Sequence, residues 1–168
     1  MPLLVLTMIC LVVSTALALV NSITYPIISA AAVERAEASM IEKIPHAAGF
    51  EMIEFDHDDG IPSTIREIYR TTNDVGYIFI AAVSGFSGDI VVICGIDPDG
   101  LIIASSTLSH TETQGIGTIL EKESFLEPFE GLDNRLEGID TVTGATISTR
   151  AYIHAINDIF IAFEKVKD

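Results

Sequence analysis

The longest apolar run in the hydrophobic pattern lies at the start of the chain. From Leu3 to Val20, 15 of 18 side chains are apolar, and the three hydroxyl side chains among them can bond back to a helix backbone. A helix of this length measures about 27 Å, close to the hydrocarbon thickness of a bilayer. Polar residues follow, and Pro26 marks the end of the run or a kink. We therefore predict a single transmembrane anchor over residues 1–28.

A cleaved signal peptide is the alternative, because the chain continues with Ala30, Ala31 and Ala32, the small residues that a cleavage site needs. A signal peptide also has a basic start and a shorter apolar run, and this segment has neither. The segment likewise lacks the Lys and Arg residues that would fix its orientation in a bilayer. We expect a retained anchor whose orientation does not follow from charge.

The polar part of the chain begins with residues 30–44, where small, charged and apolar residues alternate at helical spacing until Pro45 stops the pattern. This predicts a linker helix over residues 29–45. Short apolar or alternating runs follow, separated by turn signals such as Asp97-Pro98-Asp99-Gly100. Each run predicts a strand: residues 50–55, 64–69, 77–83, 90–96 and 101–108.

The last third of the chain changes from strands to a loop and a helix. A polar loop with two glycines covers residues 110–117. The chain ends in an amphipathic helix, because apolar residues form one stripe: Ala151, Ala155, Ile156, Ile159, Phe160 and Phe163. Strands followed by a helix, without repeated alternation of the two, predict an α+β domain. We assign residues 46–168 to this domain and expect an antiparallel sheet with the helix on one face.

Charge separates the two parts of the chain. All 9 Lys and Arg and all 24 Asp and Glu residues lie at or after Glu34, so this part carries the whole formal net charge of −15. A polyanion of this density does not bind nucleic acid, and an anionic leaflet would repel it. Any attachment to membrane lipid therefore falls to the first segment. The two cysteines, Cys10 and Cys94, exclude a disulfide scaffold and a cysteine zinc site.

Two patterns that suggest metal binding are better explained as turns. Asp97-x-Asp99-Gly100 opens like a calcium loop, but apolar residues follow where oxygen ligands should be. His57 lies among aspartates in a turn, and His46 and His154 have no partner at ligand spacing. The sequence also has no Cys/His nucleophile pair, phosphate loop or dinucleotide fingerprint. We predict no metal site and no catalytic residue.

One segment stands out from this background: Asp140-Thr141-Val142-Thr143-Gly144-Ala145-Thr146, directly before the terminal helix. Two explanations are open. Thr146 or Ser148 is an ordinary N-cap that satisfies helix N–H groups. Alternatively, the helix entrance is an anion site, because free N–H groups and the helix dipole favour a phosphate. A phosphate held there would lie beside the hydroxyl of Thr146.

A second motif lies earlier in the chain, at residues 109–117, which read Ser-His-Thr-Glu-Thr-Gln-Gly-Ile-Gly. Together the two motifs resemble the FMN-binding domain of the G subunit of Rnf electron-transport complexes, also present in the C subunit of the sodium-translocating NADH:quinone reductase. The heptad matches that family's D-x-x-[ST]-G-A-[ST] flavinylation signature at every fixed position. The second motif resembles its H-x-E-T-P-G-[LI]-G loop, with Gln114 in place of proline. The resemblance extends over nearly the full chain.

The resemblance implies that the hydroxyl of Thr146 carries FMN through a phosphodiester bond, within a motif that includes Asp140, Thr143, Gly144 and Ala145. It also implies that a separate Mg²⁺-dependent flavin transferase installs the group from FAD, with Asp140 as a candidate recognition residue. The second motif is expected to wrap the cofactor with its own residues: His110, Glu112, Thr113, Gly115 and Gly117.

The resemblance further implies a membrane-anchored electron-carrier subunit of an Rnf-type ion-translocating ferredoxin:NAD oxidoreductase complex. We expect the domain on the outer, periplasmic face of the cell membrane, a side that follows from the resemblance alone. The chain has no nicotinamide or iron–sulfur motif, so those steps belong to partner subunits and this subunit is not catalytic alone. The alternatives are the FMN subunit of the sodium-translocating quinone reductase or another membrane reductase, and an assembly scaffold without redox function.

Overall fold

The computed structural model describes residues 5–18, 44, 46–115 and 117–167. The chain divides into two units, Met1–Glu37 and Ala38–Asp168. In the first unit, residues 5–18 form a helix with exposed side chains. Within the described residues, no helix combines the length and apolar character that a membrane crossing requires. The expected boundary between anchor and linker, and the linker helix itself except Ile44, lie outside the described residues.

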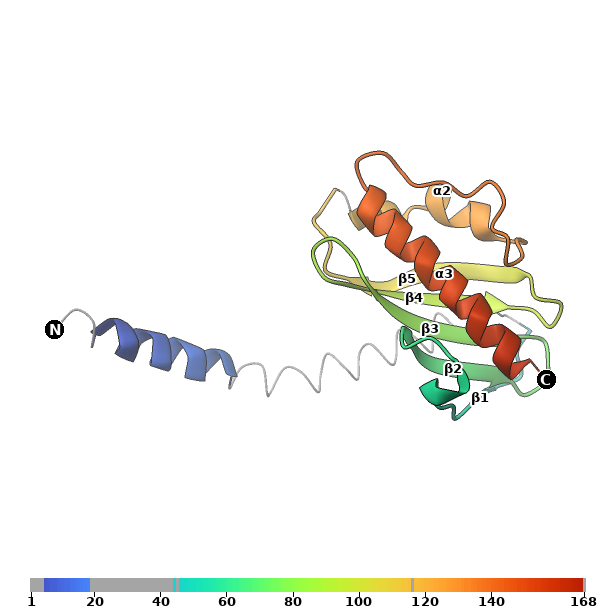
Figure 1. Ribbon diagram of the computed structural model, residues 1–168, viewed down its shortest axis with the longest axis horizontal. Coiled ribbons are helices and arrows are strands. Elements are labelled where there is room, and N and C mark those ends of the chain that lie inside the picture. Colours follow the sequence, from blue (N-terminus) through green and yellow to red (C-terminus); the bar gives the residue numbers. More distant parts are fainter. Residues whose placement is uncertain (1–4, 19–43, 45, 116, 168) are drawn as a thin grey trace. The chain divides into compact units, whose positions relative to one another are not determined.

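The second unit is built on a five-stranded antiparallel sheet in which chain neighbours are sheet neighbours, as Figure 1 shows. This confirms the predicted antiparallel sheet. Turns of the predicted kind join the strands, and the turn after β4 is closed by a 3.1 Å hydrogen bond from Gly100 N to Asp97 O. The strands are β1 (Phe50–Met52), β2 (Ile65–Thr71), β3 (Tyr77–Ser84), β4 (Asp89–Ile96) and β5 (Ile102–His110).

Three strands end two or more residues away from their predicted ends, among them β2, which runs to Thr71 instead of residue 69. β1 stops at Met52 instead of residue 55, because the chain leaves the sheet for the 3₁₀ helix η1 (His57–Asp59). β5 continues to His110, which pairs with Ile90 of β4. His110 is therefore the end of a strand and not the start of a loop. At the other end of the predicted loop, Gly117 begins the 3₁₀ helix η2 (Gly117–Glu121).

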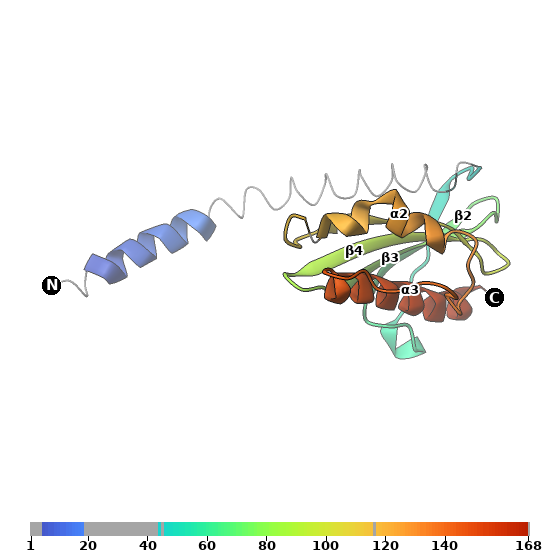
Figure 2. The ribbon, with the colours of Figure 1, turned by 90° about the horizontal axis from the view of Figure 1, so that it is seen from above.

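The C-terminal helix α3 (Thr146–Val166) packs against β3 and β4 on one face of the sheet (Figure 2). Its predicted apolar stripe is confirmed, and the ring of Phe163 meets the edges of Tyr77 and Phe79 with centroid separations of 5.6 and 6.3 Å. The helix begins more than a turn before the stripe, at Thr146. The terminal helix therefore starts inside the conspicuous heptad.

A smaller aromatic cluster lies beside α3, where the short helices α2 (Glu123–Leu126) and η3 (Glu127–Phe129) pack. The rings of Phe125 and Phe129 lie 5.3 and 5.4 Å from that of Tyr152. Burial raises the pKa of Tyr152 and that of Cys94 far above their ordinary values. Cys10 and Cys94 are both free.

β3 and β4 are buried on both faces. Phe79 belongs to the core beneath α3, whereas Ile78 and Ile93 are outside that core and are completely buried as well. Ile44 approaches the same strands, since a Cβ on Gly95 would lie 3.4 Å from its Cγ1. Burial on both faces explains why these two strands read as nearly continuous apolar runs.

Candidate functional site

The start of α3 is shaped by a glycine and lacks a side-chain cap. Gly144 has a φ of 88°, a left-handed conformation that favours glycine, and the N-cap is Ala145, with no capping side-chain bond. The alternative in which Thr146 or Ser148 is an ordinary N-cap is therefore wrong. The first helical hydrogen bond runs from Thr149 N to Ala145 O at 2.9 Å. The N–H groups of Thr146, Ile147 and Ser148 precede it, so they have no partner within the helix.

The hydroxyl of Thr146 lies in this helix entrance and is weakly held. It donates to the carbonyl of Val142 over 3.4 Å, near the limit for a hydrogen bond. Its residue lines a cavity of about 270 Å³ that is open to solvent. The other lining residues come from the turn between β3 and β4, from the segment just before α3 and from the first turn of α3: Phe86, Gly144, Ala145, Ile147 and Ser148.

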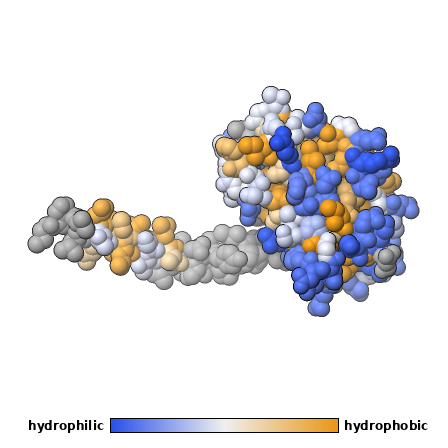
Figure 3. All heavy atoms as spheres, viewed as in Figure 1, coloured by the Kyte–Doolittle hydropathy of each residue, from blue (hydrophilic) through white to orange (hydrophobic). Residues whose placement is uncertain are grey.

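Two of the cavity residues expose large apolar side chains. Phe86 is 63% exposed and Ile147 is 54% exposed. In Figure 3 the domain surface carries orange apolar patches among hydrophilic ones, including at the end where Figure 1 places the start of α3 and the β3–β4 turn. Large apolar groups gathered at an open cavity are typical of a ligand site.

Glu112 connects the segments that form this site through hydrogen bonds to its side chain. Its side chain is buried, and Oε1 accepts hydrogen bonds from Phe86 N at 2.7 Å and Ser87 N at 3.0 Å. Its other oxygen, Oε2, accepts from the hydroxyl of Ser148 at 2.6 Å. One carboxylate therefore ties the segment after β5 to the β3–β4 turn and to the first turn of α3.

The charge of Glu112 is stabilised where it lies. Burial alone raises the pKa of a carboxyl group, but the hydrogen bonds from Ser148, Ser87 and Phe86, with His110 close by, outweigh it and hold the pKa of Glu112 below its usual range. Ionised Glu112 is an acceptor only, and its three donors match that state. Its role in this structure is to hold backbone and helix together.

The other residues of the second motif have different positions. His110 accepts from Glu112 N at its Nδ1 over 3.2 Å, and its Nε2 lies 3.2 Å from a carboxylate oxygen of Glu121. The hydroxyl of Thr113 lies 3.2 Å from that of Ser87, on the same turn as Phe86. Gly115 has a φ of 91° and faces open space. Gly117 is buried, and the space a side chain would need there is filled by Glu112 and His110.

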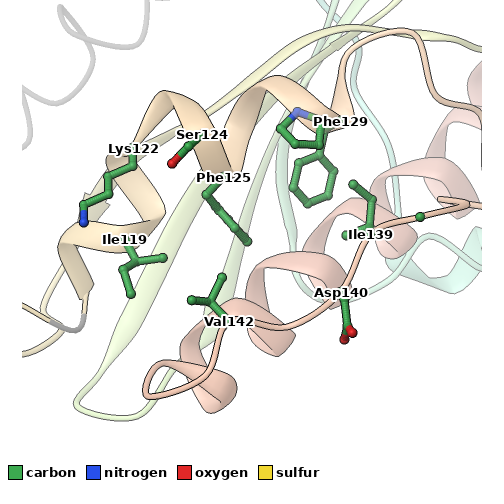
Figure 4. Close-up of a pocket in the computed structure, with 10 residues that line it drawn as sticks. Ile119, Lys122, Ser124, Phe125, Phe129, Ile139, Asp140 and Val142 are labelled. Carbon is green, nitrogen blue, oxygen red and sulfur yellow. The ribbon is translucent and has the colours of Figure 1, made fainter.

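Asp140 lies apart from Gly144, Ala145 and Thr146, which line the other cavity. It is exposed, accepts from Thr141 N at 2.6 Å, and lines a second cavity of about 360 Å³. In Figure 4, Phe125 of α2 and Val142 point toward one another across that cavity. Thr143 is exposed on the loop between the two cavities. The structure thus brings Gly144, Ala145 and Thr146 together and places Asp140 elsewhere.

Three residues of the Thr146 cavity were not anticipated from the sequence. Phe86 lies in a Gly-x-x-Gly segment that reads as an ordinary turn, Ile147 reads as part of the helix, and Ser148 reads as an ordinary N-cap. An aromatic residue in a four-residue turn between apolar strands is the signal that could have identified Phe86, because such a side chain has no core to enter.

Comparison with known proteins identifies the family of this domain. The FMN-binding domain family matches residues 85–160, a range that starts at the β3–β4 turn and includes Thr146. The G subunit of the ion-translocating oxidoreductase complex of Methanosarcina acetivorans is 31% identical over 137 residues, covering 74% of this chain and 72% of that relative. The region of residues 85–160 is therefore of the FMN-binding class.

Other relatives are also named as G subunits. The G subunit of the Na⁺-translocating ferredoxin:NAD⁺ oxidoreductase complex of Acetobacterium woodii is 28% identical, over 92% of this chain and 86% of that relative. The G subunit of Shewanella piezotolerans is 34% identical over 51% of this chain, and the match spans about half of that relative (47%). The solved structure of NqrC from Shewanella oneidensis has the same fold, with a TM-score of 0.56, 16% identity, and coverage of 75% and 85% of the two chains. The chain belongs to the family of G subunits of ion-translocating oxidoreductase complexes.

Proposed function

We propose that this chain is a membrane-anchored electron carrier that holds FMN through a phosphodiester bond to Thr146. The observation that carries the proposal is the position of the Thr146 hydroxyl. It lies at the first residue of a 21-residue helix, in an open cavity, within a domain of the FMN-binding family. The hydroxyl donates one long hydrogen bond, so its oxygen is available for a bond to phosphorus.

The residues around the cavity fit the parts of FMN. The phosphate of a group on Thr146 would lie against the N–H groups of the first turn of α3, where the helix dipole favours an anion. Gly144 leaves room beside this phosphate, since a Cβ on residue 144 would meet nothing within 4 Å. The exposed side chains of Phe86 and Ile147 form an apolar surface, which suits contact with the flavin ring better than contact with the charged phosphate.

FMN bound in this way accepts and passes electrons, and the domain holds it in place. A covalent bond keeps the cofactor bound where free flavin cannot replace it by mass action. We assign the attachment reaction to a separate flavin transferase, because the cavity residues include no acid–base pair or group of metal-binding side chains. Asp140 remains our candidate for recognition by that enzyme, and its exposed position outside the Thr146 cavity is compatible with such a role.

The names of the relatives support placement in an ion-translocating ferredoxin:NAD oxidoreductase complex. In such a complex, partner subunits carry out the iron–sulfur and nicotinamide steps, and this chain relays electrons between them. We propose that the apolar N-terminal segment anchors the protein in the cell membrane and that the flavin domain faces outward.

The test is intact mass spectrometry and in-gel flavin fluorescence of the full chain produced in a host with the transferase. The expected mass excess is that of FMN less one water, and the denatured band is expected to fluoresce. Thr146→Ala should abolish both signals, whereas Thr141→Ala, at a variable position of the same heptad, should keep both. A wild-type protein without bound flavin would instead favour the assembly scaffold. A fluorescent Thr146→Ala band would move the attachment to another residue.

A further inference from the structure

Phe86 is an exposed aromatic side chain on a rigid turn. The turn is closed by a 2.8 Å hydrogen bond from Gly85 N to Gly88 O. Side chains of the segment after β5 pack directly against this turn. Glu112 fills the space that a Cβ on Gly85 would need, and Thr111 fills the space that a Cβ on Gly88 would need. A ring that is 63% exposed on a tightly held backbone contributes little to the core. Its position therefore calls for a role outside the core.

The backbone of Phe86 is linked to the helix that carries Thr146. Glu112 Oε1 accepts the Phe86 N–H, and Oε2 of the same carboxylate accepts the Ser148 hydroxyl. Since Ser148 lies two residues after Thr146, the carboxylate fixes the distance between the aromatic turn and the attachment residue. This linkage is buried and made by a charged acceptor, which makes both hydrogen bonds strong.

Ile147 supplies a second apolar wall from a different element. Its side chain is 54% exposed and lines the same cavity as Phe86 and Thr146. Neither Phe86 nor Ile147 can hydrogen-bond through its side chain, so this part of the cavity suits a flat apolar ring and not a phosphate or a sugar chain. Aromatic rings pack on one another in offset or edge-on arrangements, with an energy beyond simple burial.

On this basis we propose that Phe86 packs against the isoalloxazine ring of the flavin attached at Thr146, with Ile147 as the opposing apolar contact and Glu112 as the positioning residue. The inference rests on the proposed attachment of FMN to Thr146. It adds the place where the ring lies, which is the β3–β4 turn. It also gives the buried Glu112 a specific task, since loss of its carboxylate would release the turn from α3.

The test uses contact quenching, because an indole in van der Waals contact with a flavin quenches its fluorescence by electron transfer, whereas a phenyl ring does not. Phe86→Trp should lower the fluorescence of the native, flavin-loaded protein several-fold. The denatured band should keep the wild-type signal, which shows that attachment is unchanged. Met52→Trp is the matched control, since Met52 is 59% exposed on β1, at the opposite edge of the sheet from β5. Phe86→Ala should shift the flavin absorption maxima of the native protein.

Two results would overturn the assignment of Phe86: native fluorescence equal in Phe86→Trp and Met52→Trp, or an unshifted absorption spectrum in Phe86→Ala. A dark wild-type band in the denaturing gel would instead refute the attachment itself, so the two failures are distinguishable. For Glu112, the quenched Phe86→Trp protein is combined with Glu112→Ala or Glu112→Gln. The alanine should restore fluorescence, and the glutamine, which keeps an acceptor oxygen for the turn, should stay quenched.

Glu112→Ala removes a buried acceptor, and thermal unfolding by circular dichroism checks that the variant is folded. If it does not fold, Ser148→Ala in the Phe86→Trp protein replaces it, because this change removes only the bond between the carboxylate and α3. Partial recovery of fluorescence in Ser148→Ala supports the positioning role. Full quenching in a folded Glu112→Ala or Ser148→Ala protein contradicts it.

Discussion

Ser148 and Glu112 lie 36 positions apart in the chain, and the serine hydroxyl donates a 2.6 Å hydrogen bond to Oε2 of the glutamate. Both residues are buried, at 1% and 7% exposure. The bond joins the last helix of the domain to the segment that follows the last strand. It is thus a long-range contact within the proposed flavin site.

Ser148→Ala should lower the free energy of unfolding by about 1.5–3 kcal/mol, the range for a hydrogen bond to a charged group. The physical reason is that one oxygen of a buried carboxylate loses its donor. Urea unfolding of the protein measures the change. Ser124→Ala, an exposed serine on α2, is the control and should stay within about 0.5 kcal/mol of wild type. Equal stability of Ser148→Ala and wild type would contradict the geometry.

Stability should depend on pH through Glu112. Its pKa in the folded protein lies below the ordinary value of 4.5, so the ionised form stabilises the fold. This contribution is fully present above pH 4.5 and is lost as the pH falls through the lower pKa of the folded state. Urea unfolding between neutral and acidic pH should show the stability gap between wild type and Glu112→Gln shrinking below pH 4.5. A gap that stays constant over that range would refute the role of the charge.

Gly117→Ala should disturb the same contact indirectly. A Cβ at residue 117 would overlap the side chain of Glu112 and lie 3.0 Å from Cε1 of His110, so the loop must shift, at a cost of about 1–3 kcal/mol. Gly115→Ala meets open space and is strained only by its φ of 91°. In double-mutant cycles with Ser148→Ala, Gly117→Ala should be non-additive and Gly115→Ala additive. Additivity for both pairs would mean that Gly117 is not packed against the carboxylate.

The strands could be predicted because apolar alternation and turn residues agree along the chain, as the turn at Asp97 to Gly100 illustrates. The end of β5 could not be predicted in this way. Ser109 and His110 are polar and read as a loop, but their backbones pair with Val91 and Ile90 of β4. Backbone pairing does not depend on side-chain polarity, so periodicity alone places this strand end too early.

The motif of the proposed site could be predicted from the sequence, but the spatial arrangement of its residues could not. The heptad pointed to Thr146 at a helix entrance, and the helix does begin there. Asp140 lies at a different cavity, because the chain turns through Gly144 before the helix starts. The role of Glu112 depends on donors that come from two distant elements. Such convergence follows from tertiary packing, which one-dimensional patterns do not contain.

The expected topology can be tested in cells. If the N-terminal segment is a retained anchor and the domain faces outward, the protein should resist carbonate extraction, and external protease should digest the domain in intact spheroplasts. The span rests on the 18-residue uncharged run from Leu3 to Val20. A cytoplasmic protein of the same host is the control and should survive until lysis. Digestion of the domain only after lysis would place it on the cytoplasmic side.

The proposed flavin cavity is completed by α3, which follows all five strands in the described part of the chain. Ribosomes release a protein from its N-terminus onward, so a nascent chain that already holds all five strands still lacks residues 144–148 in their folded position. The hydrogen bond that joins Glu112, and with it the turn carrying Phe86, to α3 forms only once the helix that supplies Ser148 is present. A group on Thr146 that depends on this folded cavity can therefore be added only after α3 has been synthesised and has packed on the sheet, and a chain truncated before α3 cannot form the cavity.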